Sequence, residues 1–119
     1  MKYDISALGN ALVDTQYMVD HDFLDEIGLE ADSMTLASAE EHSPIIDKLE
    51  SMGVESVSDC GGSATNSLVA ASYYGSKCHH VCRVANDEDG KKYLESLQKA
   101  GVQHIGYSKE DSEMPTGKC

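Results

Sequence analysis

The sequence predicts an α/β protein with a mostly parallel sheet, helical crossovers and a small β-rich insertion. From residue 54 onward, short β-prone runs alternate with runs whose apolar residues recur at helical spacing, and glycines follow the predicted helices. Such alternation favours parallel strands that are joined by helices. A length of 119 residues with 40% hydrophobic content supports one compact unit at most.

The N-terminal half is less regular. Apolar residues alternate over residues 3–7, which predicts a first strand that ends in a loop at Gly9. Residues 15–19 and 33–36 are further β-prone runs, and residues 22–27 predict a single helical turn closed by Gly28. The short strands between Asp14 and Gly61 have no evident place in the main sheet, so we expect the insertion to form a separate flap.

A helix over residues 39–52 has the strongest local signal. Ser38 and Glu41 form a capping-box pair ahead of apolar residues at helical spacing, and Gly53 follows that run. The later predicted elements are a strand over 54–59, a helix over 63–74, a strand over 79–85, a helix from the acidic segment 86–89 to residue 100, a strand over 102–107, an acidic loop over 108–113 and the start of a strand at 114–117.

The chain is strongly acidic. Twenty-one Asp and Glu against nine Lys and Arg give a formal net charge of −12, and no basic cluster offsets it. We therefore expect neither nucleic acid nor an anionic membrane as a partner, and attribute the acidity to a solvated surface. The lack of a long apolar stretch or an apolar leader, and four cysteines without CxxC spacing, predict a cytoplasmic protein without disulfides.

Residues 61–66, Gly-Gly-Ser-Ala-Thr-Asn, form a Gly-rich turn that leads into a predicted helix. Backbone N–H groups and the Asn66 amide converge at the N-terminus of such a helix, where they can hold hydroxyl groups or an anion. The motif is neither a GxGxxG fingerprint nor a P-loop. The alternative interpretation is that the two glycines serve only tight packing.

Residues 9–14, Gly-Asn-Ala-Leu-Val-Asp, follow the first predicted strand directly. Asn10 and Asp14 are therefore expected in the crevice at the carboxyl end of that strand, where open α/β sheets bind ligands. The Asp14 carboxylate can accept hydrogen bonds from both hydroxyls of a diol. The alternative interpretation of Asp14 is a turn or cap residue.

Cys78, His79, His80 and Cys82 suggest a metal site, but their spacing does not support one. In a strand, Cys78, His80 and Cys82 share one face while His79 faces the other way, and no fourth ligand is evident. We expect no metal here and interpret these residues as part of a buried strand.

Together the two motifs resemble those of the ribokinase-like (PfkB) family of carbohydrate and nucleoside kinases. Residues 9–14 resemble the family's first-strand motif, whose aspartate contacts sugar hydroxyls, and residues 61–66 resemble its Gly-Gly signature. Residues 84–102 resemble the next strand–helix–strand unit, and residues 115–117 resemble the strand after it. The resemblance implies a Rossmann-like fold and a substrate pocket formed by Asn10, Asp14, Gly61, Gly62, Ser63 and Asn66.

Within the family, both motifs and the long helix-containing insertion are most similar to adenosine kinases, although Ala11 stands where proline is common. The resemblance implies ATP- and Mg²⁺-dependent phosphorylation of a primary hydroxyl of a nucleoside or, alternatively, of ribose or another sugar. It also implies that the catalytic aspartate lies downstream in a GAGD-type motif, which residues 1–119 lack, and that the ATP site lies in the C-terminal part as well. We therefore expect a fragment that is inactive alone, with no catalytic residue of its own.

The implied organisation is the start of an α/β domain over residues 1–13, a lid insertion over 14–60, and the continued α/β domain over 61–119. A sheet cut in this way would leave an unpaired edge strand and an uncovered apolar helix face, so we expect a homodimer or strand exchange. The competing hypothesis is a free-standing, non-catalytic binding or assembly module. A reading frame that continues past Cys119 with a GAGD-like motif would favour the kinase.

Overall fold

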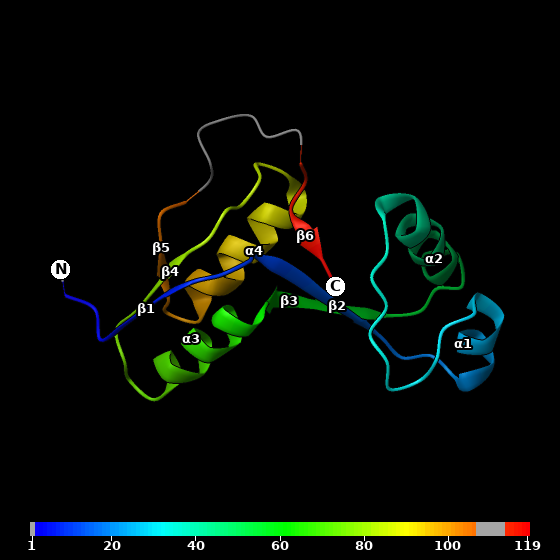
Figure 1. Cartoon of the computed structure of the whole chain (residues 1–119), viewed down its shortest axis with the longest axis horizontal. Coiled ribbons are helices and arrows are strands. Elements are labelled where there is room, and N and C mark those ends of the chain that lie inside the picture. The colour runs from blue at the N-terminus through cyan, green and yellow to red at the C-terminus, as the bar shows by residue number, and fades with distance from the viewer. Residues whose placement is uncertain (1, 107–113) are drawn as a thin grey trace. The chain divides into compact units, whose positions relative to one another are not determined.

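The computed structural model describes residues 2–106 and 114–119 (Figure 1). The chain forms two compact units, one of Met1–Thr15 with Ser58–Cys119 and the other of Gln16–Val57, so the prediction of one compact unit at most was wrong. The elements in chain order are β1 (Ile5–Leu8), β2 (Leu12–Tyr17), α1 (His21–Ile27), α2 (Ala39–Ser51), β3 (Ser56–Gly61), α3 (Ser63–Tyr73), β4 (Cys78–Val81), α4 (Glu88–Lys99), β5 (Gln103–His104) and β6 (Gly117–Lys118).

A parallel three-stranded sheet lies at the centre of the first unit, with the order β1-β4-β5. Ile5 pairs with Cys78 and Leu8 with Val81, while His79 pairs with Gln103 on the other side of β4. The helix α3 precedes β4 and α4 joins β4 to β5. The predicted α/β fold with a mostly parallel sheet and helical crossovers is therefore confirmed.

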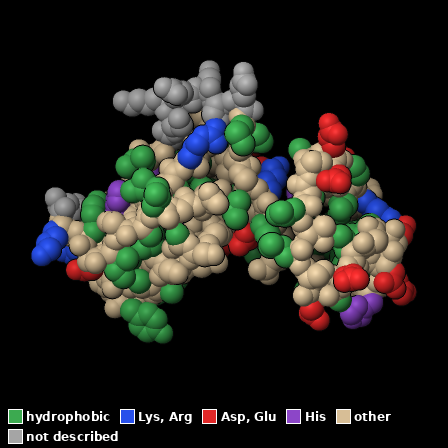
Figure 2. Space-filling view, viewed as in Figure 1, with side chains coloured by type: hydrophobic (Ala, Val, Ile, Leu, Met, Phe, Trp, Pro, Cys, Tyr) green, Lys and Arg blue, Asp and Glu red, His purple; other side chains and the backbone are tan. Residues whose placement is uncertain are grey.

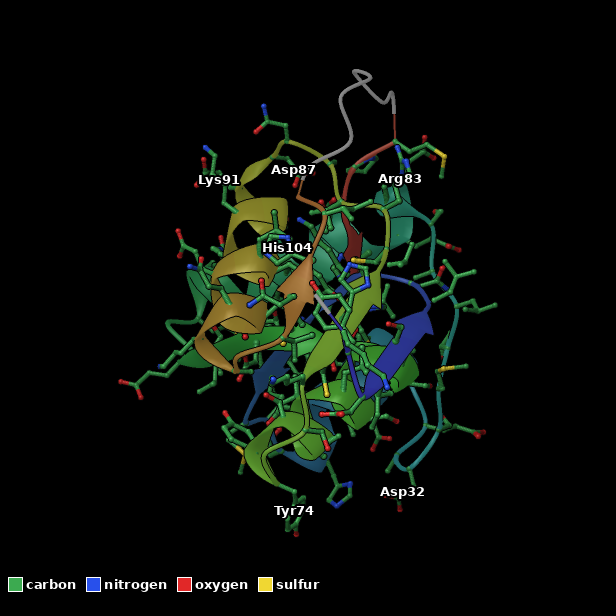
Figure 3. The ribbon with its side chains drawn as sticks, turned by 90° about the vertical axis from the view of Figure 1, so that its left-hand side faces the viewer. Asp32, Tyr74, Arg83, Asp87, Lys91 and His104 are labelled. Carbon is green, nitrogen blue, oxygen red and sulfur yellow. The ribbon has the colours of Figure 1, made fainter. Side chains whose placement is uncertain are left out.

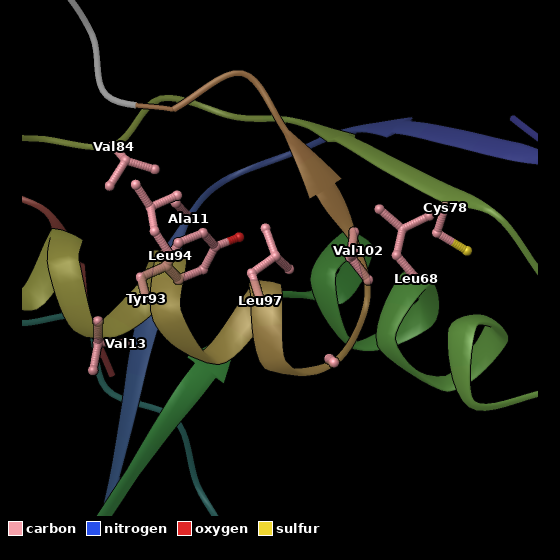
Figure 4. Packing of buried hydrophobic residues seen from close by; sticks show 10 residues of the cluster. Ala11, Val13, Leu68, Cys78, Val84, Tyr93, Leu94, Leu97 and Val102 are labelled. Atoms are coloured by element: carbon pink, nitrogen blue, oxygen red, sulfur yellow. The ribbon is translucent and has the colours of Figure 1, made fainter. Parts of the chain in front are cut away.

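The core of the first unit lies between this sheet and the two helices (Figure 4). Leu68 of α3 and Leu97 of α4 are fully buried together with Cys78 and Val102. Each large apolar side chain that is removed from water in this way contributes about 1.5–3 kcal/mol. The helix α3, which carries the predicted site residues Ser63 and Asn66, and the helix α4 are thereby fixed to the strands.

A second sheet has the strand order β3-β2-β6. Leu12 pairs with Gly117 in the parallel β2–β6 ladder. The Cys119 N–H donates to the Val13 carbonyl at 2.9 Å, and the Thr15 N–H donates to the Cys119 carbonyl at 2.7 Å. The last residue of the chain therefore holds the backbone on both sides of Asp14.

The unit Gln16–Val57 has its own small core and most of the acidity. Phe23 and Leu49 are buried, and the Lys48 ammonium contacts Glu26 at 2.5 Å and lies 5.6 Å from the centroid of the Phe23 ring. Eleven of the 21 acidic residues but only one of the nine basic residues fall in this unit. Figure 2 shows acidic side chains over the region of α1 and α2.

The helix predictions agree closely with the structure. The helix predicted over 39–52 is α2, and its capping box is present, with the Glu41 N–H donating to Ser38 Oγ and the Ser38 N–H donating to the Glu41 carboxylate. α1 ends at Gly28, which has a left-handed φ of 71°. The helices predicted over 63–74 and up to residue 100 correspond to α3 and α4.

Several strand predictions were wrong. Residues 33–36 form no strand, and their apolar side chains Met34 and Leu36 are 83% and 88% exposed, so β propensity there found no partner strand. β1 begins at Ile5 rather than at residue 3, and β2 begins at Leu12 rather than at residue 15.

The later strands are shorter than predicted. β4 ends at Val81 rather than at residue 85, because β1 ends at Leu8 and the Gly9 N–H makes the last bond to the Val81 carbonyl, at 3.2 Å. β5 covers only Gln103–His104. The predicted loop over 108–113 lies outside the described residues. No helix among residues 2–106 and 114–119 is both long and apolar enough to cross a bilayer.

Candidate functional site

The two predicted motifs meet within the first unit. Gly61, at the end of β3, lies so close to β2 that a Cβ on residue 61 would overlap the Asp14 carboxylate. A Cβ on Gly62 would lie 2.8 Å from the Asn10 carbonyl oxygen, and Gly62 also has a φ of 101° that strongly favours glycine. The backbone at residue 62 thus requires glycine, and the absence of a side chain at both positions lets the two motifs approach closely, which brings Asp14 and Asn10 to the start of α3.

The start of α3 is exposed and polar. Ser63 is its first residue, Asn66 lies in the same turn, and both are exposed. The Asn66 N–H donates to the Gly62 carbonyl at 2.9 Å, and no described side chain caps this helix end. Backbone N–H groups at a helix N-terminus favour anionic or hydroxyl oxygens, so this turn can complement the half-buried Asp14 beside it.

A hollow of about 600 Å³ lies at the carboxyl ends of β1 and β4. Asn10 is the one predicted site residue in its lining, whereas Asp14, Gly61, Gly62, Ser63 and Asn66 are not part of it. Arg83, which is labelled in Figure 3, also lines it and donates from Nη2 to the Met114 carbonyl at 3.3 Å. The position of the hollow agrees with the general rule that open α/β sheets bind ligands beyond the carboxyl ends of their strands.

A buried hydrogen-bonded group beneath α3 was not predicted. The Thr65 hydroxyl oxygen lies 2.9 Å from the Tyr93 hydroxyl and 3.0 Å from His80 Nε2, and His80 Nδ1 lies 3.3 Å from the Ala7 carbonyl oxygen. Thr65, His80 and Tyr93 have no measurable exposure. Burial raises the pKa of the Tyr93 phenol, which keeps that hydroxyl protonated and able to donate.

A second group that was not predicted centres on Asp87, the N-cap of α4 (Figure 3). Its carboxylate accepts from the Gly90 N–H at 2.7 Å, from the Thr116 N–H at 2.8 Å and from the Thr116 hydroxyl at 2.7 Å. Burial alone would raise the pKa of Asp87, but these hydrogen bonds outweigh it and lower the pKa below its ordinary value. Asp87 therefore fastens the start of α4 to the residues before β6.

The cysteine and histidine residues of β4 lie as the strand pattern predicted. Cys78 and His80 are buried on the same side, while His79 is half-buried and stacks on Tyr3 with ring centroids 4.8 Å apart. Among residues 2–106 and 114–119, no group of three or more His, Cys, Asp and Glu side chains is arranged to hold a metal ion.

Comparison with known proteins shows similarity to adenosine kinases. No family model matches the chain. Adenosine kinase 1 from Arabidopsis thaliana is 30% identical over 116 residues, which cover 94% of this chain and 32% of that protein. The structure of adenosine kinase from Sinorhizobium meliloti matches with a TM-score of 0.77 and 28% identity, covering 99% of this chain and 35% of that one. The chain resembles the N-terminal part of adenosine kinases.

A further adenosine kinase structure agrees with this result. The enzyme from Anopheles gambiae, in complex with P1,P4-di(adenosine-5) tetraphosphate, matches with a TM-score of 0.76 and 28% identity over 96% of this chain and 35% of that one. The fold is thus that of the ribokinase-like kinases, as the sequence predicted. The chain spans about a third of the length of the adenosine kinases it matches.

Proposed function

We propose that this chain forms the acceptor-binding part of an ATP-dependent kinase that phosphorylates a primary hydroxyl of a nucleoside, with adenosine as the favoured acceptor. The observation that carries the proposal is the contact of Asp14 with Gly61 and of the Asn10 backbone with Gly62, which joins the two motifs at one place. The likeness to adenosine kinases over almost the whole chain supports it.

The proposed role of this chain is to bind the nucleoside and to orient its sugar. The Asp14 carboxylate accepts hydrogen bonds from two ribose hydroxyls, and Asn10 and Asn66 supply polar groups on either side. Ser63 and the N–H groups at the start of α3 complete the polar surface. Holding the sugar by two hydroxyls fixes where its primary hydroxyl points, which is the contribution of positioning to phosphoryl transfer. ATP and Mg²⁺ would be held by residues outside this chain.

The unit Gln16–Val57 is proposed as the lid of this site. Its own buried residues Phe23 and Leu49 and the Lys48–Glu26 ion pair give it an internal structure of its own, which a lid requires. A lid of this kind would exclude water from the reacting hydroxyl. Hydrogen exchange of residues 16–57 should slow when adenosine is added to the full-length protein, and unchanged exchange at saturating adenosine would contradict the lid.

The experiment that tests the function uses the full-length protein that contains this chain. ADP release is measured with Mg·ATP and, in turn, adenosine, inosine, ribose and other sugars. We expect release with adenosine at the highest kcat/KM. If ADP is released with ribose but not with adenosine, the acceptor is a free sugar and not a nucleoside. If none of the acceptors gives ADP release, a non-catalytic module is favoured.

A matched pair of carboxylate variants then tests the site. Asp14→Ala removes the hydrogen bonds between the substrate hydroxyls and the charged carboxylate. These bonds contribute about 1.5–3 kcal/mol, so their loss should raise the KM for the nucleoside roughly 10- to 150-fold. The KM for ATP should not change. Glu95→Ala, which removes an exposed carboxylate from α4, is the control and should leave both constants unchanged. A change in the KM for ATP alone would contradict the assignment of Asp14 to the nucleoside site.

A further inference from the structure

One buried hydroxyl, that of Thr65, lies in the first turn of α3. No described side chain caps this helix end, and the turn before it contains two adjacent glycines, the most flexible residue type. Thr65, in the first turn of α3, points into the protein instead of out to solvent, with no exposed surface. Its hydroxyl contacts His80 of β4 and Tyr93 of α4.

The chemistry of the partners sets the direction of each hydrogen bond. A carbonyl oxygen can only accept, so His80 Nδ1 carries the proton that it gives to the Ala7 carbonyl. In that tautomer, Nε2 accepts from the Thr65 hydroxyl, and Thr65 in turn accepts from the Tyr93 hydroxyl. The chain of donors runs from Tyr93 through Thr65 and His80 to Ala7, and every polar atom in it has a partner.

This chain of hydrogen bonds connects the two segments that carry the predicted pocket. Ala7 lies two residues before Gly9, and Thr65 lies next to Asn66. Gly9 also packs directly on α3, because a Cβ there would lie 2.7 Å from Ala64 Cβ and 3.6 Å from His80 Cε1. The His80 ring therefore touches the end of β1 and the start of α3 at once.

We propose that Thr65 is a positioning residue for acceptor binding, which acts through His80 and Tyr93 to fix the start of α3 against the loop after β1. This inference rests on the proposed function, since Asn10, Asp14 and Asn66 form the acceptor pocket there. A hydroxyl in a buried network holds one geometry, whereas an apolar contact of equal size permits sliding. Thr65 thus sets the distance between Asn66 and Asn10.

Valine is the substitution that isolates this role. Thr65→Val keeps the branched shape and volume of the side chain but removes the hydroxyl, so Tyr93 and His80 lose their shared partner. Thr65→Ser keeps the hydroxyl and loses one methyl group. Tyr93→Phe removes the outer donor to Thr65, together with the Tyr93–Cys82 hydrogen bond, and leaves the Thr65–His80 bond in place.

The kinetic test uses the full-length protein with adenosine and Mg·ATP. We expect Thr65→Val to raise the KM for adenosine roughly 3- to 30-fold, the range for changes within a coupled network, with the KM for ATP unchanged. Tyr93→Phe should raise the KM for adenosine by a smaller factor, and Thr65→Ser should leave this KM at the wild-type value. Val102→Ala, a buried change away from the pocket, is the stability control and should leave the KM for adenosine unchanged.

A second measurement checks the network without any enzyme activity. Nitrogen NMR of the imidazole should show His80 with its proton on Nδ1, and the Nε2 signal should move downfield in Thr65→Val as its donor is lost. A proton on Nε2 in the wild type would overturn the inference. So would a folded Thr65→Val protein that keeps the wild-type KM for adenosine.

The two proposals fail in different ways. If the wild-type protein phosphorylates no acceptor, the proposed function and the pocket role of Thr65 are both overturned, whatever the NMR shows. If the wild-type protein is active and Thr65→Val changes only the melting temperature, as Val102→Ala does, the proposed function stands and the positioning role of Thr65 is overturned.

Discussion

Replacing Gly61 by alanine should move the Asp14 carboxylate and do little else. A Cβ at residue 61 would overlap that carboxylate, which is the end of a flexible side chain rather than backbone. Gly61 is not among the glycines with a left-handed φ, so its backbone tolerates alanine. The overlap is therefore relieved by rotation of the Asp14 side chain.

The expected effects on stability and on binding differ in size. Forcing Asp14 to a less favourable rotamer costs about 1 kcal/mol, and the smaller entropy of the unfolded chain on changing Gly to Ala returns about 0.4–1 kcal/mol. The melting temperature should therefore shift by at most a few degrees. Loss of the hydrogen bonds that the Asp14 carboxylate accepts from the hydroxyls of the proposed substrate removes about 1.5–3 kcal/mol of binding, which is roughly 10- to 150-fold in KM.

A double-mutant cycle on the full-length protein provides the assay. The KM for adenosine is measured for the wild type, Gly61→Ala, Asp14→Ala and the double variant. If Gly61→Ala acts by displacing Asp14, the double variant should bind adenosine as weakly as Asp14→Ala and no more weakly. Equal factors for Gly61→Ala in the wild-type and Asp14→Ala backgrounds would refute the reasoning, because the alanine would then act independently of Asp14.

Three further predictions concern stability and association. Asp87→Ala should lower the free energy of unfolding by about 1–2 kcal/mol, measured by urea denaturation, because the N-cap of α4 and the bonds to Thr116 are lost. Because these bonds lower the pKa of Asp87, its stabilising effect should be complete above the ordinary carboxyl pKa of about 4 and disappear as the pH falls through the lower folded value. Asp87→Asn should flatten that part of the pH profile, and an unchanged profile would contradict the assignment. Leu8, 81% exposed on the edge strand β1, should promote self-association of the 119-residue chain, so sedimentation should show a dimer that Leu8→Lys dissociates. A wild-type monomer at micromolar concentration would exclude this.

Local signals in the sequence predicted the helices well. The capping box of Ser38 and Glu41 lies within one turn, and Gly28 ends α1 by its own backbone preference, so neither depends on distant residues. The strand predicted over 33–36 failed for the opposite reason. Its β propensity is real, but a strand forms only where another strand supplies hydrogen bonds, and residues 33–36 have no such neighbour in the structure.

The candidate site was predictable in part. The residues of both motifs were chosen from the sequence, and the contacts of Asp14 with Gly61 and of Asn10 with Gly62 join them. The contacts of Thr65 with His80 and Tyr93 and of Asp87 with Thr116 were missed because these partners lie 15 to 29 residues away, in segments whose positions are set by tertiary packing. One signal was available for Thr65, since it precedes the buried Leu68 by three residues on the same helical face.

The hydrogen bond between the Thr15 and Ser58 hydroxyls, 2.9 Å long, joins the two points where the chain leaves and re-enters the first unit. The 42 residues from Gln16 to Val57 are thus a loop whose ends are already closed. Lengthening a loop from a four-residue turn to this size costs only about 2 kcal/mol of closure entropy. Evolution can therefore lengthen, shorten or exchange this insertion at small cost, while Asp14 and the segments that support it stay as they are.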